Sequence, residues 1–154
     1  MASIEEVQEW LVAKLFADAT LASYLAAITY ADGAGAAIYE AYPASGAEHP
    51  CVDWATLGEL PAEEQDADGD KNVLWRLQLS ARSLTTSSYW GPTRNAAIYN
   101  RIDALLYDLP QRETCTTDNF RILHIRRGPM RDLTEDGRLH QKVADWAVKA
   151  IRNS

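Results

Sequence analysis

The spacing of hydrophobic residues at the start of the chain is helical. Ser3 and Glu6 form a capping-box pattern that opens a first helix. Its apolar stripe comprises Val7, Trp10, Leu11, the stem of Lys14, and Leu15. Thr20 can cap a second short helix that continues through Ile28. The stretch ADGAGAA at 31–37 then ends the helical pattern, because glycine tolerates backbone angles that other residues do not.

In the middle of the chain the period falls to two. Residues 37–43 alternate and stop at Pro43, and residues 50–60 form a second alternating run. The clearest strand is 72–83, NVLWRLQLSARS. One of its faces carries Val73, Trp75, Leu77, Leu79 and Ala81, and the other carries Leu74, Arg76, Gln78, Ser80 and Arg82. This strand is predicted to cover a core while presenting a mostly polar outer face.

From Thr93 the period becomes helical again. The broad apolar stripe, which ends at Pro110, comprises Ala97, Ile98, the stem of Arg101, Ile102, Leu105, Leu106 and Leu109. The preceding stretch, LTTSSYWGPT at 84–93, is predicted to be a loop. An amphipathic helix is therefore expected two thirds of the way along the chain.

The last part of the chain returns to strand patterns. Residues 119–130 read as a strand with a bend or bulge at Gly128-Pro129, and RDLTEDGR supplies a turn in which Asp136-Gly137 is a hairpin signal. Residues 138–151 fit a strand or a helix by pattern alone, and the hairpin turn before them favours a strand.

These elements predict an α+β fold of one domain over residues 1–154. Short turns between successive strands favour a mainly antiparallel β-sheet, packed against the amphipathic helix and preceded by an N-terminal helical region. A hydrophobic fraction of 47% suits a soluble chain with a real core. Four tryptophans lie on predicted apolar faces and are expected in that core: Trp10, Trp54, Trp75 and Trp146.

Charge and cysteine content narrow the function classes. The 22 acidic and 15 basic side chains give a net charge of −7, which argues against a surface built mainly to hold nucleic acid. The N-terminus carries no signal-peptide pattern, and no window of the chain holds an apolar run long enough to span a membrane. We therefore expect a cytosolic protein without membrane partners, in which Cys51 and Cys115 are reduced.

The acidic stretch DADGD resembles the opening of a calcium-binding loop. An EF-hand loop that starts at Asp66 needs glycine at its sixth position and glutamate at its twelfth, but these positions are Lys71 and Leu77. A strand rather than a helix follows. Asp66, Asp68 and Asp70 are therefore expected to form a solvated acidic loop between two strands, open to contact with a neighbouring protein.

No other pattern in the chain predicts a metal, a cofactor or a reaction. His49 and Cys51 lie two apart without further ligands at zinc-site spacing. His124 and His140 lie on the strands that flank a hairpin, where cross-strand pairing is possible and a hydrogen-bonded sheet histidine is the default. No nucleophile motif is present, and the carboxylates at 63–64 lie in an exposed loop where burial would not tune their pKa. We expect a protein that is not an enzyme and has no cofactor.

Two features predict contacts with other proteins. One is a basic cluster: Arg121, Arg126, Arg127, Arg131 and Arg138. It is either a sheet edge protected by charge or a contact to an acidic neighbour, with another protein favoured over DNA. The other feature is Tyr89-Trp90, because aromatic residues beside Gly-Pro in a loop often anchor interfaces. The alternative for Trp90 is packing over the helix that follows it.

The layout between residues 36 and 151 is also informative. Its features are the polar-faced strand at 73–82, the helix two thirds along, and one spacing in the first strands: Tyr39, Tyr42, Pro43, His49, Pro50 and Val52. This layout resembles the tail terminator (tail-completion) proteins of long-tailed bacteriophages.

The resemblance implies a virion protein of the tail and neck that assembles in the host cytoplasm. Its subunits would form a homo-hexameric ring on the tail tube protein, end tube polymerisation and offer a surface to a head-completion or connector protein, while DNA passes through the bore without specific binding. Two alternatives stay open: a head-completion or connector protein of the same neck, and a small non-catalytic adaptor that grips a partner through Trp90 and the arginines.

Overall fold

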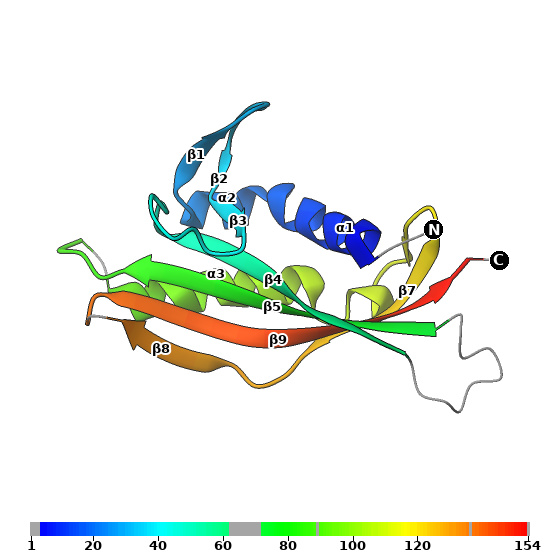
Figure 1. Ribbon diagram of the computed structural model, residues 1–154. Coiled ribbons are helices and arrows are strands. Elements are labelled where there is room, and N and C mark those ends of the chain that lie inside the picture. Colours follow the sequence, from blue (N-terminus) through cyan, green and yellow to red (C-terminus); the bar gives the residue numbers. More distant parts are fainter. Residues whose placement is uncertain (1–3, 62–71, 89, 136, 154) are drawn as a thin grey trace.

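The computed structural model describes residues 4–61, 72–88, 90–135 and 137–153. It confirms the α+β class, with a curled and mostly antiparallel sheet that packs against helices (Figure 1). Ser3, the predicted cap, lies outside the described residues. The Glu6 carboxylate accepts hydrogen bonds from the backbone and side-chain nitrogens of Asn119 at 2.8 and 2.9 Å. These bonds connect the first helix to a turn that lies more than 100 residues further along the chain.

The helices are α1 (Ile4–Phe16), α2 (Ala19–Tyr24) and α3 (Gly91–Leu106), and a short 3₁₀ turn, η1, spans Leu109–Gln111. Asp18 caps α2 by accepting a hydrogen bond from the backbone N–H of Leu21 at 2.8 Å. The prediction that Thr20 caps this helix is therefore wrong. Asp18 precedes it and presents a carboxylate to the free N–H groups of the first turn.

The expected extension of the second helix through Ile28 is also wrong. Residues Ala27–Tyr30 form β1, which pairs antiparallel with β2 (Gly33–Ala36) in a hairpin that projects beside α2 (Figure 1). The β-branched Ile28 and Thr29 favour strand over helix. Gly33, at a φ of +129°, adopts a backbone angle that other residues rarely reach.

The main sheet has the strand order β3-β4-β5-β9-β7-β6, with β8 also paired to β9. The strands are β3 (Ile38–Glu40), β4 (Cys51–Pro61), β5 (Asn72–Leu84), β6 (Cys115–Thr116), β7 (Phe120–Arg127), β8 (Arg131–Glu135) and β9 (Leu139–Arg152). β3 is parallel to β4, whereas the other pairs are antiparallel. The expectation of antiparallel neighbours fails at β3, because the connection at 41–50 is long enough to carry the chain back to the same end.

The last element is a strand, as predicted, and it is the central strand of the sheet. β5 runs along one edge of β9, and β7 and β8 share the other edge. β8 was predicted to be part of a turn. Its side chains are all exposed, so its sequence has no alternation of apolar and polar residues that would indicate a strand. The bend at 128–130 places it against β9. Asp136 of the predicted hairpin turn lies outside the described residues.

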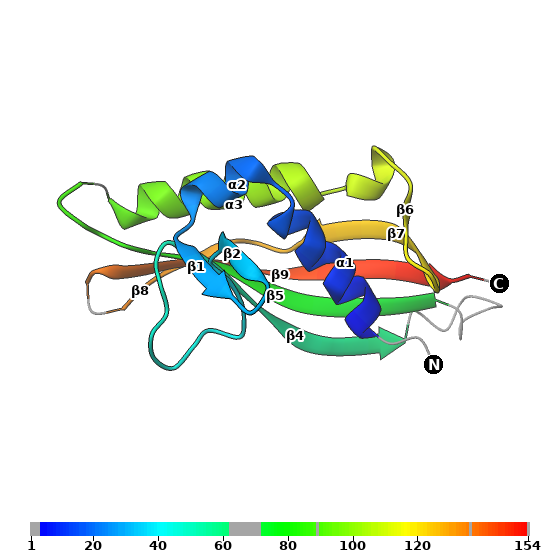
Figure 2. The same cartoon turned by 90° about the horizontal axis from the view of Figure 1, so that it is seen from above.

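All three α-helices lie on one face of the sheet (Figure 2). The predicted core face of β5 is confirmed, since Val73, Trp75, Leu77, Leu79 and Ala81 are buried. Trp146 on β9 is also buried, whereas Trp10 and Trp54 are partly buried against the core. No helix among the described residues is both long and apolar enough to cross a membrane.

Candidate functional site

The face of the sheet turned away from the helices is the candidate functional surface. It is called the open face here, and its central side chains are Leu74, Arg76 and Gln78 on β5 with Asp145, Ala147 and Lys149 on β9. These residues alternate with core residues such as Leu77 and Trp146, so they point the other way. No helix of the described residues covers them (Figures 1 and 2).

Asp145 lies at the centre of the open face, between two arginines. Its Oδ2 is 3.7 Å from a terminal nitrogen of Arg76 and its Oδ1 is 3.7 Å from a terminal nitrogen of Arg131. The Gln78 amide donates to the same carboxylate at 3.5 Å. One negative charge thus faces two positive charges, which leaves a net positive centre on an otherwise acidic protein.

A hollow of about 400 Å³ opens beside this centre. It is lined by Arg76, Gly128, Pro129, Arg131, Asp145, Trp146 and Ala147. The bend at Gly128-Pro129 creates it, because the chain leaves β7 there and rejoins β9 only at Arg131. The hollow therefore combines small apolar lining residues with two guanidinium groups.

Arginines on the helix side of the sheet are bound differently. Arg127 donates to both carboxylate oxygens of Asp103 at 2.7 and 2.9 Å, and Arg101 donates to both of Asp18 at 2.8 and 2.6 Å. The hydrogen bond from Arg101 is the main reason that the pKa of Asp18 lies below its usual range. These two-pronged pairs use the guanidinium donors to fix α2, α3 and β7 to one another.

At one end of the sheet, the segment 41–50 covers the open face. The ring of Tyr42 stacks on the Arg82 guanidinium at 3.9 Å, and its hydroxyl shares a hydrogen bond of 2.6 Å with Nε2 of His49. Arg82 donates to Asp53 at 2.7 Å. Burial raises the pKa of Asp53 despite this arginine, and burial also lowers the pKa of His49. These contacts fasten the segment to the sheet.

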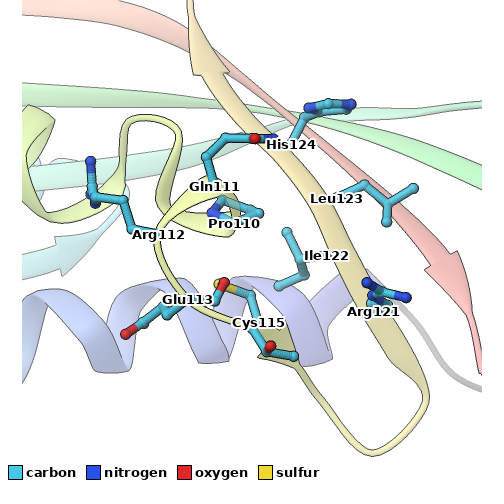
Figure 3. A pocket seen from close by; sticks show the side chains of 10 residues that line it. Pro110, Gln111, Arg112, Glu113, Cys115, Arg121, Ile122, Leu123 and His124 are labelled. Carbon is cyan, nitrogen blue, oxygen red and sulfur yellow. The ribbon is translucent and has the colours of Figure 1, made fainter.

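A second hollow, of about 530 Å³, lies between β7 and the segment after η1 (Figure 3). Cys115 lies in its wall, and burial raises the pKa of this thiol. Arg112 donates to the carbonyls of Tyr107 and Ala104 and so caps the end of α3. Nδ1 of His124 is buried without a hydrogen-bond partner among the described residues.

The five predicted arginines do not form one cluster. Arg121 lies opposite Ile151 near one end of β9, whereas Arg138 precedes Leu139 at the other end, about 40 Å away at the rise of a strand. Arg126 pairs with Asp108 at 3.0 Å, and Arg127 is bound to Asp103. Of the set, Arg131 alone lines the hollow on the open face. Arg76 and Asp145 join it there, although the sequence did not single them out.

Trp90 is exposed, as its loop position predicted, with 61% of its surface accessible. A shallow hollow of about 350 Å³ lies beside it over the first turns of α3. Asp66, Asp68, Asp70 and Tyr89 lie outside the described residues. The interface roles of Trp90 and of these four residues stay predictions.

His124 and His140 are not cross-strand neighbours in the sheet. His124 lies opposite Lys149, and His140 lies opposite Ser83 on one side and Thr134 on the other. Within the described part of the chain no three His, Cys, Asp or Glu side chains lie close enough to hold a metal ion. Cys51 and Cys115 are both free thiols in buried positions.

No protein-family model matches this chain, and no curated protein matches it. Among solved structures, a similar fold occurs in a chain of the virion of a native gene transfer agent (GTA) particle. The two structures superpose with a TM-score of 0.67 at 14% sequence identity, and the alignment covers 99% of this chain and 98% of the other. At this identity the likeness establishes a shared fold over the full length of both chains.

Proposed function

We propose that this chain is a structural protein of a phage-like virion. The observation that carries the proposal is the full-length likeness to a chain of a gene transfer agent virion, with neither chain holding a large part that the other lacks. A fold can host unrelated functions, so the proposal also rests on the surface. That surface offers an open sheet face and an exposed Trp90 for contacts with other proteins.

Within the virion, we infer a ring, hexameric in the simplest case, that caps the tail tube and joins it to the neck. Its partners are copies of itself, the tail tube protein and a head-completion or connector protein. A ring requires two different patches on each subunit that fit each other. The net charge of −7 suits a bore through which DNA passes, because like charge keeps phosphates from sticking to the wall.

The test is electron microscopy of the purified chain, alone and with tail tubes of its own virion. Closed rings that sit on tube ends and stop tube growth are the expected result. A chain that stays monomeric and leaves tube length unchanged would refute the ring. Rings that bind isolated connectors but ignore tubes would instead favour a head-completion role in the same neck.

A further inference from the structure

Arg76 and Arg131 differ from the other paired arginines because their hydrogen-bond donors are left without acceptors among the described residues. Each approaches Asp145 only to 3.7 Å, beyond hydrogen-bond length, and neither donates a hydrogen bond to another described residue. Their side chains are 47% and 57% exposed. Two guanidinium groups with free donors therefore converge on the hollow of the open face.

We propose that this hollow binds carboxylate side chains from the acidic segment 62–71 of a second copy of the chain. The proposal rests on the ring proposed above and names one of its subunit contacts. Guanidinium donors match carboxylate oxygens in pairs, which gives such a contact both direction and strength. Asp145 neutralises one of the two arginines, so one positive charge is left to attract a partner.

Charge complementarity selects the occupant. Segment 62–71, AEEQDADGDK, carries five carboxylates and one lysine, and so holds net charge −4 of the −7 on the whole chain. A neighbouring copy therefore offers its densest negative charge in this segment. The opposing surface is built from other residues, so the contact joins two different patches and is head-to-tail, the kind that closes into rings.

Segment 62–71 follows β4 and precedes β5 in the sequence, so it is also close in sequence to the hollow of its own subunit. Arg76 lies four residues beyond Asn72, about 13 Å along the strand. A contact within one subunit and a contact between subunits would use the same charges. The decisive experiment must therefore separate the two arrangements as well as test the pairing itself.

The first arm reverses the charge of the hollow. Arg76→Glu with Arg131→Glu should raise the concentration needed for half-assembly at least about tenfold, because each contact then sets like charges against each other. Arg126→Glu is the matched control, since Arg126 is 57% exposed like Arg131 but is bound to Asp108 outside the hollow. Circular dichroism and urea unfolding check that each variant folds, and light scattering follows assembly.

The second arm uses complementation between two chains. The hollow variant is mixed with a segment variant that carries Asp66→Lys, Asp68→Lys and Asp70→Lys. Each variant alone should fail to assemble, whereas the mixture should form rings in which the two alternate, because every contact then joins opposite charges. If the mixture fails to assemble and rings form only when all five changes are placed in one chain, the segment contacts the hollow of its own subunit. That result would overturn the proposal.

The remaining outcomes are also decisive. Rings that form equally well from the native chain and the hollow variant would refute this contact and leave the proposed ring intact. Variants that form rings normally but lose tube capping would assign the hollow to the tube protein, against the proposal. A native chain that forms no ring, alone or on tubes, would remove the proposed function and this contact with it.

Discussion

The helix side of the central sheet and the uncovered centre of its open face hold charged side chains differently. On the helix side, Tyr99 packs on Trp146 and accepts its indole N–H at 2.9 Å, and arginines grip carboxylates with two hydrogen bonds each. On the open face, Arg76 and Arg131 stand 3.7 Å from Asp145. The same strands, β5 and β9, supply residues to both faces.

This difference separates stability from recognition. Hydrogen-bonding groups satisfied inside the subunit contribute to its folding and have little left to offer another molecule. Groups held loosely at an exposed face add little to folding, but they keep donors free for a partner. Residues that alternate along one strand are thus expected to respond to mutation in different assays.

The largest effect is expected from Trp146→Ala. This side chain is 1% exposed, and its ring packs against both Tyr99 and Tyr107. The free energy of unfolding should fall by about 3–5 kcal/mol in urea titrations, because a large cavity opens in the core. Lys149→Ala, on the open face of the same strand, is the control and should stay within about 0.5 kcal/mol of the native value. A loss below that limit for Trp146→Ala would contradict the division between the faces.

Tyr99→Phe should have the next largest effect. The hydroxyl of this buried tyrosine donates to the carbonyl of Leu79 at 2.9 Å and accepts the indole N–H of Trp146. Its removal leaves that N–H buried without this partner, and we expect a loss of about 1–3 kcal/mol in the free energy of unfolding. Tyr107→Phe, at a partly exposed ring, should change it little. Equal losses for the two variants would show that the hydrogen bonds of the buried Tyr99 hydroxyl contribute no more to stability than the exposed hydroxyl of Tyr107.

Sequence patterns predicted the elements whose two faces differ most. β5 has apolar residues at every second position from Val73 to Ala81, so both its period and its buried face were evident. β9 was ambiguous because Val143, Ala147 and Ile151 add apolar residues on its other face. β8 was missed because every one of its side chains is exposed.

The candidate site could not be predicted from local patterns. The alternation of β5 placed Arg76 on the outer face, but its meeting with Asp145 depends on the offset between β5 and β9. Arg131 joins them only because the bend at 128–130 sets the register of β8. Strand offsets arise from how the whole sheet packs, so residues distant in sequence converge without a local signal.

His49 provides a test at the end of the sheet where the open face is covered. Burial lowers its pKa below the ordinary value near 6.5, so the unfolded chain takes up this proton more readily than the folded one. The contribution of His49 to stability is therefore present above pH 6.5 and is lost as the pH falls through the lowered pKa. Urea unfolding at pH 7.5 and 5.5 should show this loss in the native chain.

His49→Gln is the matched variant, since its amide keeps a polar partner for Tyr42 without titrating. The difference in unfolding free energy between the two pH values should be smaller for His49→Gln than for the native chain. The same pH dependence in both proteins would mean that other groups, such as Glu6 with its lowered pKa, account for it.

Asp145→Ala is expected to have the smallest effect on the free energy of unfolding. A small effect is what distinguishes this carboxylate from Asp103 on the helix side. Its contacts to the arginines are long, and its side chain is 39% exposed, so the free energy of unfolding should change by less than about 0.5 kcal/mol. Asp103→Ala removes the short, two-pronged pair with Arg127 and should cost about 1 kcal/mol.

Both variants can be measured in the same urea titration. Equal losses would mean that the open face holds its arginines as firmly as the helix side does. Their donors would then be committed within the subunit, and the hollow would have no reason to bind an acidic segment from a neighbour. The open face can serve recognition only if Asp145→Ala lowers the free energy of unfolding clearly less than Asp103→Ala does.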